Sequence, residues 1–404
     1  MGTIKQNYAN NITSGGDFDA TDLSGTIPAD NINNTSVSSV TTYGTAGSGV
    51  VSVSSDPPSP TIGDVWFNTA VNKFKYAGAG VGSWASGASL NTARAYMQGN
   101  GIQTAAQIAG GANPSGSPKA NNELYDGTSW TETTDVPAGK QNAASSGTQT
   151  ASFLATGLQP WPNNSAVSYE WGGSSWTEIA EVNTARYGSV GLGSTEAALI
   201  GGGYSGINDP KVESFNGTSW TEVSDFNTSG PRERGSCGTL TAGIAAGGEP
   251  PAVAHAETWD GSSWTEVGDL NTARSAGAKP SNGTQTAAIY STGNTGTTVE
   301  TWDGSSWTEV ANTNTQRSGA FGMGTSTAQL ICGGYAPPAY ITNTENWNGS
   351  AWTEVNDLST GRGQDVPNGA GTATSAMAAG GVNHPGSPAG SNLTTNTEEW
   401  DFPP

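Results

Sequence analysis

Histidine and cysteine, the side chains that most often ligate metals or act as nucleophiles, are scarce in this sequence of 404 residues. Neither of the two histidines, His255 and His384, has a Cys, Asp or Glu at the spacing of a metal site. The two cysteines, Cys237 and Cys332, lack a CxxC spacing, and either two buried thiols or a disulfide would fit them. HExxH, GxSxG and a Gly-rich loop with a phosphate-binding Lys do not occur. We therefore expect no enzyme, no metal and no cofactor.

Carboxylates are abundant, but most of them recur periodically. A glycosidase would need two carboxylates that break the period, and only Asp209 and Asp365 stand apart, as single loop residues expected to face solvent. The net charge of −20 disfavours nucleic acids and anionic membranes as partners. No apolar run approaches the roughly 18 residues of a membrane span. No apolar segment of a signal peptide follows Met1, so we expect no export by the usual secretory route.

The charged residues that do recur form one basic and two acidic series. The basic series is Arg94, Lys140, Arg186, Arg274, Arg317 and Arg362, with Arg232 and Arg234 in the remaining unit. The first acidic series is Glu123, Glu213, Glu257, Glu300, Glu345 and Glu398, with Glu170 one place shifted, and the second is Glu132, Glu178, Glu222, Glu266, Glu309 and Glu354. This pattern predicts ion pairs or charge-assisted hydrogen bonds between repeat units. The alternative is a ring of seven cations that binds an anionic ligand at one mouth of a central channel.

The element that positions these charges is a repeat marked by the dipeptide SW, which reads AW in the last copy. Its tryptophans are Trp84, Trp130, Trp176, Trp220, Trp264, Trp307 and Trp352, spaced by 46, 46, 44, 44, 43 and 45 residues. A period in the forties is typical of propeller blades or helical arrays. The abundance of Gly, Thr and Asn and the lack of long Ala/Leu/Glu/Lys segments favour strands and turns. The sequence therefore predicts an all-β, seven-bladed β-propeller.

Each unit divides into four strand-sized pieces, as in RGSCGTL, AGIAAGG, AETWDG and SSWTEV of the unit around Trp264. Short Asn-Gly and Asp-Gly stretches join the third and fourth pieces, as expected of tight hairpins. A Gly-Gly pair that recurs after the second strand, as in Gly110-Gly111 and Gly333-Gly334, would permit close backbone approach.

These residues resemble a known family. A double glycine, then a third-strand aromatic, then Trp about five residues on is similar to the kelch repeat, and the resemblance covers roughly residues 84–404. The Gly/Thr/Asn-rich form with NTAR in the connecting loop resembles repeat arrays in structural proteins of marine tailed phages, especially cyanophages. The resemblance implies a virion protein, such as a tail fibre or decoration protein, located at the surface of the phage particle.

The ends of the array predict how the ring closes. The seventh unit ends at its third strand, TEEWDF, and residues 83–89 form a fourth strand without a blade, so we expect 83–89 to pair with 396–402. The predicted domains are therefore an extended N-terminal anchoring arm (1–62), a hairpin or collar (63–82) with Trp66 and Phe74 as core, and the propeller (83–404). The polar arm is expected to order only against a partner, such as another virion protein or, in a homo-oligomer (a trimer), a second copy.

The repeated aromatics are expected to pack between adjacent blades, where a flat ring covers both sheets. They comprise the SW tryptophans and the third-strand residues Tyr125, Trp171, Phe215, Trp259, Trp302, Trp347 and Trp400.

The loops between the second and third strands differ in every unit, whereas the other turns are nearly constant. They lie on one face of a propeller together with the NTAR connections, and several are stiffened by proline. Candidate ligand-binding residues in these loops are Trp161, Tyr204, Tyr335, Tyr340, His255 and His384. Loops on a rigid scaffold often carry function; the alternative is sequence drift at a solvated surface.

The predicted function is that of a phage virion structural protein that binds a host-surface glycan or protein, or a neighbouring virion protein, through this loop face. A bacterial lectin-like propeller that binds carbohydrate is the alternative, and a propeller enzyme is disfavoured. The propeller alone indicates only a binding scaffold.

Overall fold

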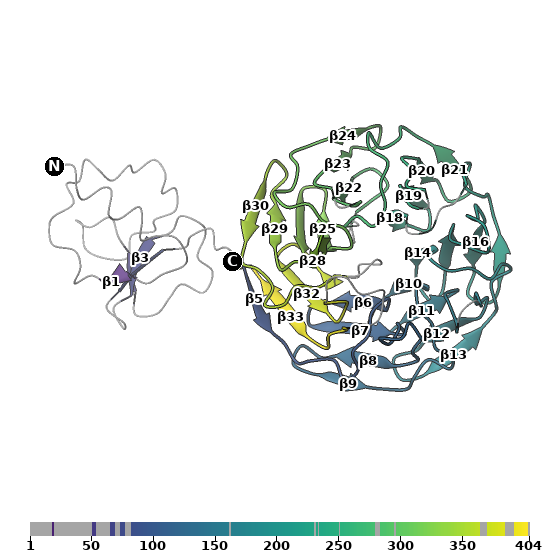
Figure 1. The fold of residues 1–404 in the computed structure, drawn as a ribbon, viewed down its shortest axis with the longest axis horizontal. Helices are drawn as coiled ribbons and strands as arrows, with labels where there is room; N and C mark the ends of the chain where they lie inside the picture. Colours follow the sequence, from purple (N-terminus) through teal and green to yellow (C-terminus); the bar gives the residue numbers. More distant parts are fainter. Residues whose placement is uncertain are drawn as a thin grey trace. The chain divides into compact units, whose positions relative to one another are not determined.

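The computed structural model describes residues 82–160, 163–229, 232, 234–249, 251–278, 283–294, 296–363, 370–383 and 392–402, and the backbone of four strands before residue 82. All regular structure in these residues is β, and they contain no helix that is long and apolar enough to cross a membrane. Seven small antiparallel sheets surround a central axis (Figure 1), so the predicted seven-bladed β-propeller is confirmed.

The first four blades are complete meanders, in which each strand pairs with the next along the chain. Blade 1 contains β6 (Gln98–Ile102), β7 (Ala105–Ala109), β8 (Asn122–Tyr125) and β9 (Trp130–Glu132). Blade 2 contains β10 (Ala144–Gly147), β11 (Ser152–Ala155), β12 (Ser168–Trp171) and β13 (Trp176–Ile179). Blade 3 contains β14 (Val190–Gly193), β15 (Ala198–Gly201), β16 (Val212–Phe215) and β17 (Trp220–Glu222). Blade 4 contains β18 (Gly235–Thr239), β19 (Ala242–Ala246), β20 (Ala256–Trp259) and β21 (Trp264–Glu266).

The remaining blades vary this plan. The described strands of blade 5 are β22 (Ala288–Ser291), β23 (Val299–Trp302) and β24 (Trp307–Glu309). Blade 6 contains β25 (Phe321–Thr325), β26 (Ala328–Cys332), β29 (Thr344–Trp347) and β30 (Trp352–Val355), with the hairpin β27 (Tyr335–Ala336) and β28 (Ala339–Tyr340) in its loop. Blade 7 contains β31 (Ala370–Gly371), β32 (Ser375–Ala379), β33 (Thr397–Asp401) and β5 (Ser83–Ser86).

Blade 7 joins the two ends of the repeat region. Its fourth strand, β5, pairs antiparallel with β33 in a register that places Trp84 opposite Trp400. This pairing corresponds to the one that the sequence predicts between 83–89 and 396–402. It covers the edge of β33, and β5 becomes the outer edge strand of blade 7.

The N-terminal residues form a unit of their own, which comprises Met1–Gly82 and Phe402–Pro404. Its four-stranded sheet contains β1 (Phe18–Asp19), β2 (Val51–Val53), β3 (Val65–Asn68) and β4 (Lys73–Tyr76). β3 and β4 form the hairpin that residues 63–78 predict. β1 pairs with β4, and β2 pairs in parallel with β3, so this hairpin is part of a four-stranded sheet. The side chains of Trp66 and Phe74 lie outside the described residues.

The propeller core lies between blades rather than in one centre. One cluster joins Phe153 of blade 2 to Ile200 and Trp220 of blade 3. In each blade the SW tryptophan also contacts the third-strand aromatic, as in Trp171 and Trp176, whose ring centroids are 5.3 Å apart. Large aromatic side chains therefore contact both their own blade and the neighbouring one.

Candidate binding surface

Six buried arginines each lie against a buried glutamate of the third strand of the same blade. The pairs are Arg94–Glu123, Arg186–Glu213, Arg234–Glu257, Arg274–Glu300, Arg317–Glu345 and Arg362–Glu398, and their side chains are at most 3% exposed. Arg234, rather than Arg232, therefore belongs to the series. The expectation of ion pairs between blades is corrected, because each pair links the connection entering a blade to that blade's own third strand.

In five of these six blades an asparagine of the connection completes the surroundings of the carboxylate, and in blade 7 the N–H of Ser359 donates to Glu398 instead, at 2.7 Å. In blade 6, Glu345 accepts hydrogen bonds from the backbone and side-chain nitrogens of Asn314, at 2.6 and 2.8 Å. Asn91, Asn183, Asn227 and Asn271 bond in the same way in their blades. Since a buried carboxylate is costly unless it is paired and hydrogen-bonded, these contacts explain why N, R and E recur together.

Contacts between neighbouring blades at this position use the backbone. Gly111 of blade 1 donates its N–H to the carbonyl of Lys140, and Gly334 of blade 6 donates to the carbonyl of Arg362. Gly111 has a φ of 101°, and a Cβ there would lie 2.7 Å from the carbonyl oxygen of Ala95. The second glycine of the pair is therefore required by both its backbone angle and the close approach.

The second acidic series faces solvent instead. Glu132, Glu222 and Glu354 accept hydrogen bonds from Asn121, Lys211 and Asn343 at 2.7, 2.7 and 2.8 Å, and all of these pairs are exposed. The prediction that both acidic series pair with the basic residues is therefore wrong for this second series.

Blade 2 departs from the other six at every position of the buried network. Lys140 replaces the arginine, and the buried ring of Tyr169 stands where the glutamate would be, 5.3 Å from the lysine Nζ. Nζ donates to the carbonyls of Thr156 and Val167 and to Ser165 Oγ. Burial lowers the pKa of Lys140 to about 7, although Glu181 and Glu178 oppose the shift.

The basic residues consequently do not form an open ring that could bind an anion. The six paired arginines and Lys140 are at most 2% exposed. The channel cavity of about 370 Å³ is lined instead mostly by glycine and small polar residues, such as Asn100, Ser145 and Ser236, together with the apolar residues Ile102 and Leu192. Its described lining contains no charged side chain.

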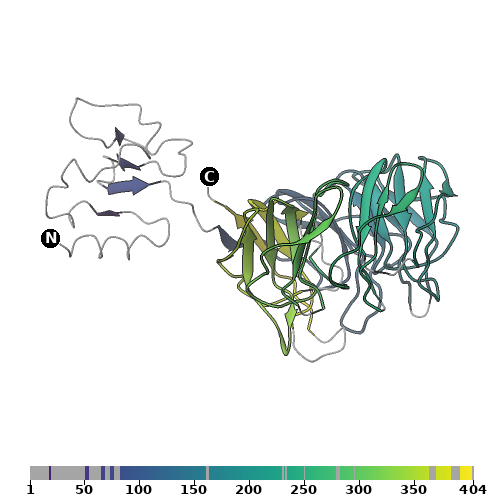
Figure 2. The same cartoon turned by 90° about the horizontal axis from the view of Figure 1, so that it is seen from above.

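The variable loops share one side of the ring with the connections between blades. Backbone bridges join connection to loop at Ala95 and Ala112 in blade 1, and at Gly363 and Val382 in blade 7. Figure 2 shows the strands running between two faces, with the longer connections gathered on one of them. We call this side, formed by the second-to-third-strand loops and the connections, the loop face.

An aromatic and cationic cluster lies on the loop face between blades 3 and 4. The rings of Tyr187 and Tyr204 are 5.7 Å apart. The guanidinium of Arg232 lies 5.5 and 5.9 Å from their centroids, and it donates a hydrogen bond to the Tyr187 hydroxyl. Tyr187 is buried, whereas Tyr204 and Arg232 are half-buried. The ring of Tyr204, supported by buried Tyr187 and beside a held cation, offers apolar area and a charged donor to a ligand.

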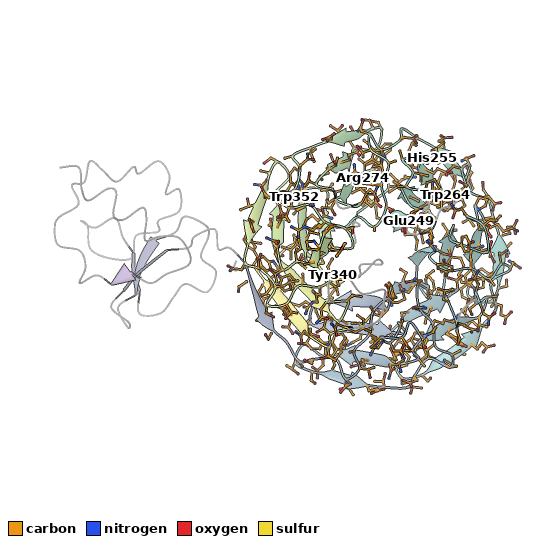
Figure 3. All side chains as sticks on the ribbon, viewed as in Figure 1. Glu249, His255, Trp264, Arg274, Tyr340 and Trp352 are labelled. Atoms are coloured by element: carbon orange, nitrogen blue, oxygen red, sulfur yellow. The ribbon has the colours of Figure 1, made fainter. Side chains whose placement is uncertain are left out.

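A second aromatic pair extends from blade 6. Tyr335 and Tyr340 face each other across the β27–β28 hairpin, with ring centroids 5.3 Å apart. Figure 3 places Tyr340 and Glu249 nearer the axis than His255. Two other candidates from the sequence, Trp161 and His384, lie outside the described residues.

Two expectations about isolated polar residues are wrong. Asp209 is only 4% exposed, because its loop folds over it and its carboxylate accepts the N–H of Lys211. His255 does have carboxylates nearby: Nδ1 lies 3.6 Å from Asp269 Oδ2, and Glu266 is close to both. The sequence could have indicated this group, because Glu266 and Asp269 follow His255 by 11 and 14 residues, across the hairpin that joins the third and fourth strands. Cys237 and Cys332 are both free and buried.

The chain is thus a seven-bladed β-propeller with a constant buried framework and a varied loop face, an architecture consistent with a role in binding. No protein-family model matches the sequence, and no curated protein matches it. Among solved structures, it is similar to the structure of YjhT, with 12% sequence identity and a TM-score of 0.49 over 77% of this chain and 96% of that chain.

Proposed function

We propose that this protein is a structural component of a phage virion that displays a propeller for binding, either to a host-surface glycan or protein or to a neighbouring virion protein. The N-terminal unit would anchor it, in contact with other virion proteins. The support for the virion assignment is the resemblance of the Gly/Thr/Asn-rich repeats to those of phage structural proteins. The proposal includes no catalytic activity, nucleic acid or membrane.

The observation that carries the binding role is the contrast between the two faces. Hairpin turns opposite the loop face repeat the same chemistry: Asp126, Asp260 and Asp303, like Asn216 and Asn348, accept the N–H groups two and three residues on. The loop face instead presents different aromatic clusters in blades 3 and 6. Exposed polar ends on rigid aromatic rings suit carbohydrate and protein ligands alike.

A glycan array probed with the full chain tests this proposal. We expect binding that is lost in Tyr204→Ala or Tyr340→Ala and retained in Thr150→Ala, a control on the opposite face. Trp161→Ala tests the remaining aromatic candidate. Equal glycan binding by all variants would exclude the loop face as the site.

The lectin-like alternative uses the same surface, so the array does not separate it from a virion role. Detection of the protein in purified phage particles, by mass spectrometry, would distinguish the two. Its absence from particles of the phage that encodes it would contradict the virion assignment.

A further inference from the structure

One position on the loop face carries a hydrogen-bond donor in three blades and a histidine in a fourth. The position lies four residues before the third-strand aromatic. Asn121, Lys211 and Asn343 occupy it in blades 1, 3 and 6, and each donates to the glutamate of the second acidic series in its own blade. In blade 4 the residue is His255, and the glutamate is Glu266.

The backbone around this position is the same in blades 4 and 6. The carbonyl of His255 accepts the N–H of Gly247 at 3.0 Å, and the carbonyl of Asn343 accepts that of Gly333 at 3.1 Å. The preceding carbonyls, of Ala254 and Thr342, accept N–H groups of Leu270 and Leu358 at 2.9 and 3.0 Å. The backbone that carries the side chain is thus held on both sides in the two blades. The aspartate differs, because Asp357 of blade 6 accepts the N–H of Thr344 and the hydroxyl of Thr342, whereas Asp269 of blade 4 lies against His255.

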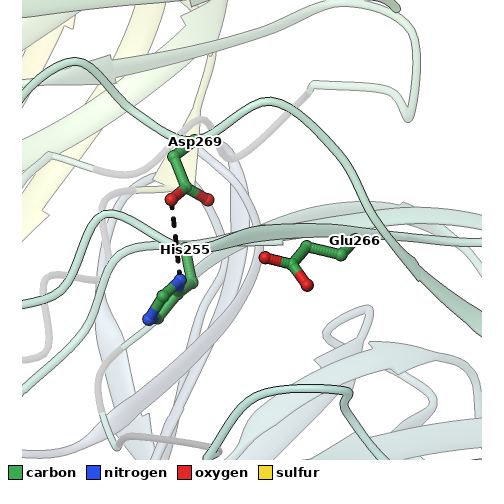
Figure 4. A group of neighbouring side chains, drawn as sticks. All are labelled: His255, Glu266 and Asp269. Carbon is green, nitrogen blue, oxygen red and sulfur yellow. Dashed lines mark ion pairs between the residues drawn. The ribbon is translucent and has the colours of Figure 1, made fainter.

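In blade 4 three side chains that can ligate a cation lie close together at this position (Figure 4). One ligand atom from each of His255, Glu266 and Asp269 lies within 4.8 Å of the others. His255 and Asp269 side chains are 39% and 43% exposed, so they have room to adjust. An asparagine amide nitrogen or a lysine ammonium has no free lone pair, whereas a neutral imidazole has one.

We propose that His255, Glu266 and Asp269 form a site for a divalent transition-metal cation of the Zn²⁺ type. A mixed set of one imidazole and two carboxylates suits Zn²⁺ and its neighbours, whereas Ca²⁺ prefers six to eight oxygen ligands. Bond lengths of about 2.0–2.2 Å require the three ligand atoms to close to separations of about 3.3 Å. Solvent would complete the coordination. This site does not depend on the proposed function.

The competing role for His255 is that of one more donor. An imidazole that carries its proton on Nδ1 would donate to Asp269 and stabilise the loop, as Asn121 and Asn343 do with their glutamates. The two roles make opposite demands on Nδ1: a proton donor keeps its proton, and a ligand gives it up. Metal titration of matched variants separates them.

The experiment is a titration of the tag-free full chain, after treatment with a chelator, with Zn²⁺ and separately with Ca²⁺, followed by calorimetry and by NMR of the histidine rings. Because the sequence has two histidines, their signals can be assigned with His255→Asn and His384→Asn. We expect one Zn²⁺ per chain, a shifted His255 signal, and affinity lowered about tenfold or more in His255→Asn, with His384→Asn unchanged. His255→Asn should fold, since Asn occupies this position in blades 1 and 6.

A variant that introduces a second site tests whether the equivalent backbone position in blade 6 can also hold a metal ligand. Asn343→His places an imidazole beside Glu354 and Asp357, the blade 6 counterparts of Glu266 and Asp269, and should raise the stoichiometry to two Zn²⁺ per chain. Equal Zn²⁺ binding by the wild type and His255→Asn, or no saturable binding by the wild type, would overturn the proposal. A stoichiometry that stays at one in Asn343→His would refute the inference from the repeat.

Discussion

In six blades a buried arginine lies against a buried glutamate, whereas in blade 2 Lys140 lies against the ring of Tyr169. The connection changes as well, because Pro137 replaces the asparagine whose N–H would reach the carboxylate. Proline has no such N–H. Blade 2 thus replaces the arginine, the glutamate and the asparagine at once. Its buried lysine donates only to carbonyl and hydroxyl oxygens.

The comparison teaches which charges the fold can omit. A buried carboxylate without its arginine and asparagine would be costly, and so would a buried arginine without its carboxylate. Blade 2 omits the carboxylate and carries a cation that can lose its proton, since burial brings the pKa of Lys140 to about 7. An arginine could not do this, because its guanidinium stays charged.

The largest expected effect comes from breaking one of the six pairs. Glu345→Gln leaves Arg317 buried without a negative partner, and the free energy of unfolding should fall by about 3–5 kcal/mol. Urea unfolding followed by tryptophan fluorescence measures it. The matched control is Glu354→Gln in the same blade, where the carboxylate is exposed. Similar losses in the two variants would show that burial of the pair is not what matters.

Converting blade 2 to the common network should remove a pH dependence. The folded pKa of Lys140, about 7, is below its ordinary value of 10.5, so the unfolded chain binds the extra proton between these values. Lys140 therefore destabilises the fold fully below pH 7. As the pH rises from 7 to 10.5 this cost is relieved, by about 1.4 kcal/mol per pH unit.

The variant Pro137→Asn, Lys140→Arg, Tyr169→Glu should lack that contribution. Its advantage over the wild type should be largest near pH 7 and shrink toward pH 10, as measured by urea midpoints across this range. A difference that does not change with pH would contradict the assigned role of Lys140.

A smaller effect is expected at the indole groups beside blade 7. Trp84 Nε1 donates to Thr344, and Trp130 Nε1 donates to Thr397, each at 2.9 Å across a blade boundary. The corresponding indoles of the other blades, such as Trp352, have no partner among the described residues. Thr344→Val and Thr397→Val should each cost about 1 kcal/mol.

Val299→Thr is the reciprocal test, because Val299 packs in one cluster with Trp352. The new hydroxyl gives that indole an acceptor, so this substitution should be close to neutral in urea unfolding. A large loss in Val299→Thr together with no loss in Thr344→Val would reverse the interpretation.

The smallest effect is expected in the hairpin turns. The hydrogen bonds that Asp303 accepts from Ser305 and Ser306 lower its pKa to about 2, and Asn348 accepts the same bonds in blade 6. Asp303→Asn should change the thermal midpoint by less than about 2 °C at pH 7, by calorimetry. A larger drop would mean that the aspartate charge itself stabilises the turn.

The fold was predictable because every blade must solve the same packing problem, so the SW tryptophans recur at a measurable period. The sequence predicted that the recurring arginines and glutamates form ion pairs, but not that each pair lies within one blade. Residues that are 23 to 36 apart in sequence meet only when the connection and the third strand are placed, as Arg94 and Glu123 show. The shift of Glu170 marked blade 2 as different without showing that Tyr169 fills the vacated space.

The loop face was less predictable. The burial of Asp209 depends on how one loop folds, which no repeat constrains. The group formed by His255, Glu266 and Asp269 depends on strand register, which places residues across a hairpin side by side. The strands β1 and β2 of the N-terminal unit were also not predicted, since they contain only two and three residues.

The pairing of β5 with β33 has a mechanical consequence. The N-terminal residues continue directly into β5, and β5 is held in blade 7 by its ladder with β33. Any pull that reaches the propeller from residues 1–82 is therefore applied first to that ladder and to the indole bond from Trp84 to Thr344. The strand that completes the ring, β5, is therefore also the first strand of the propeller to bear such a force.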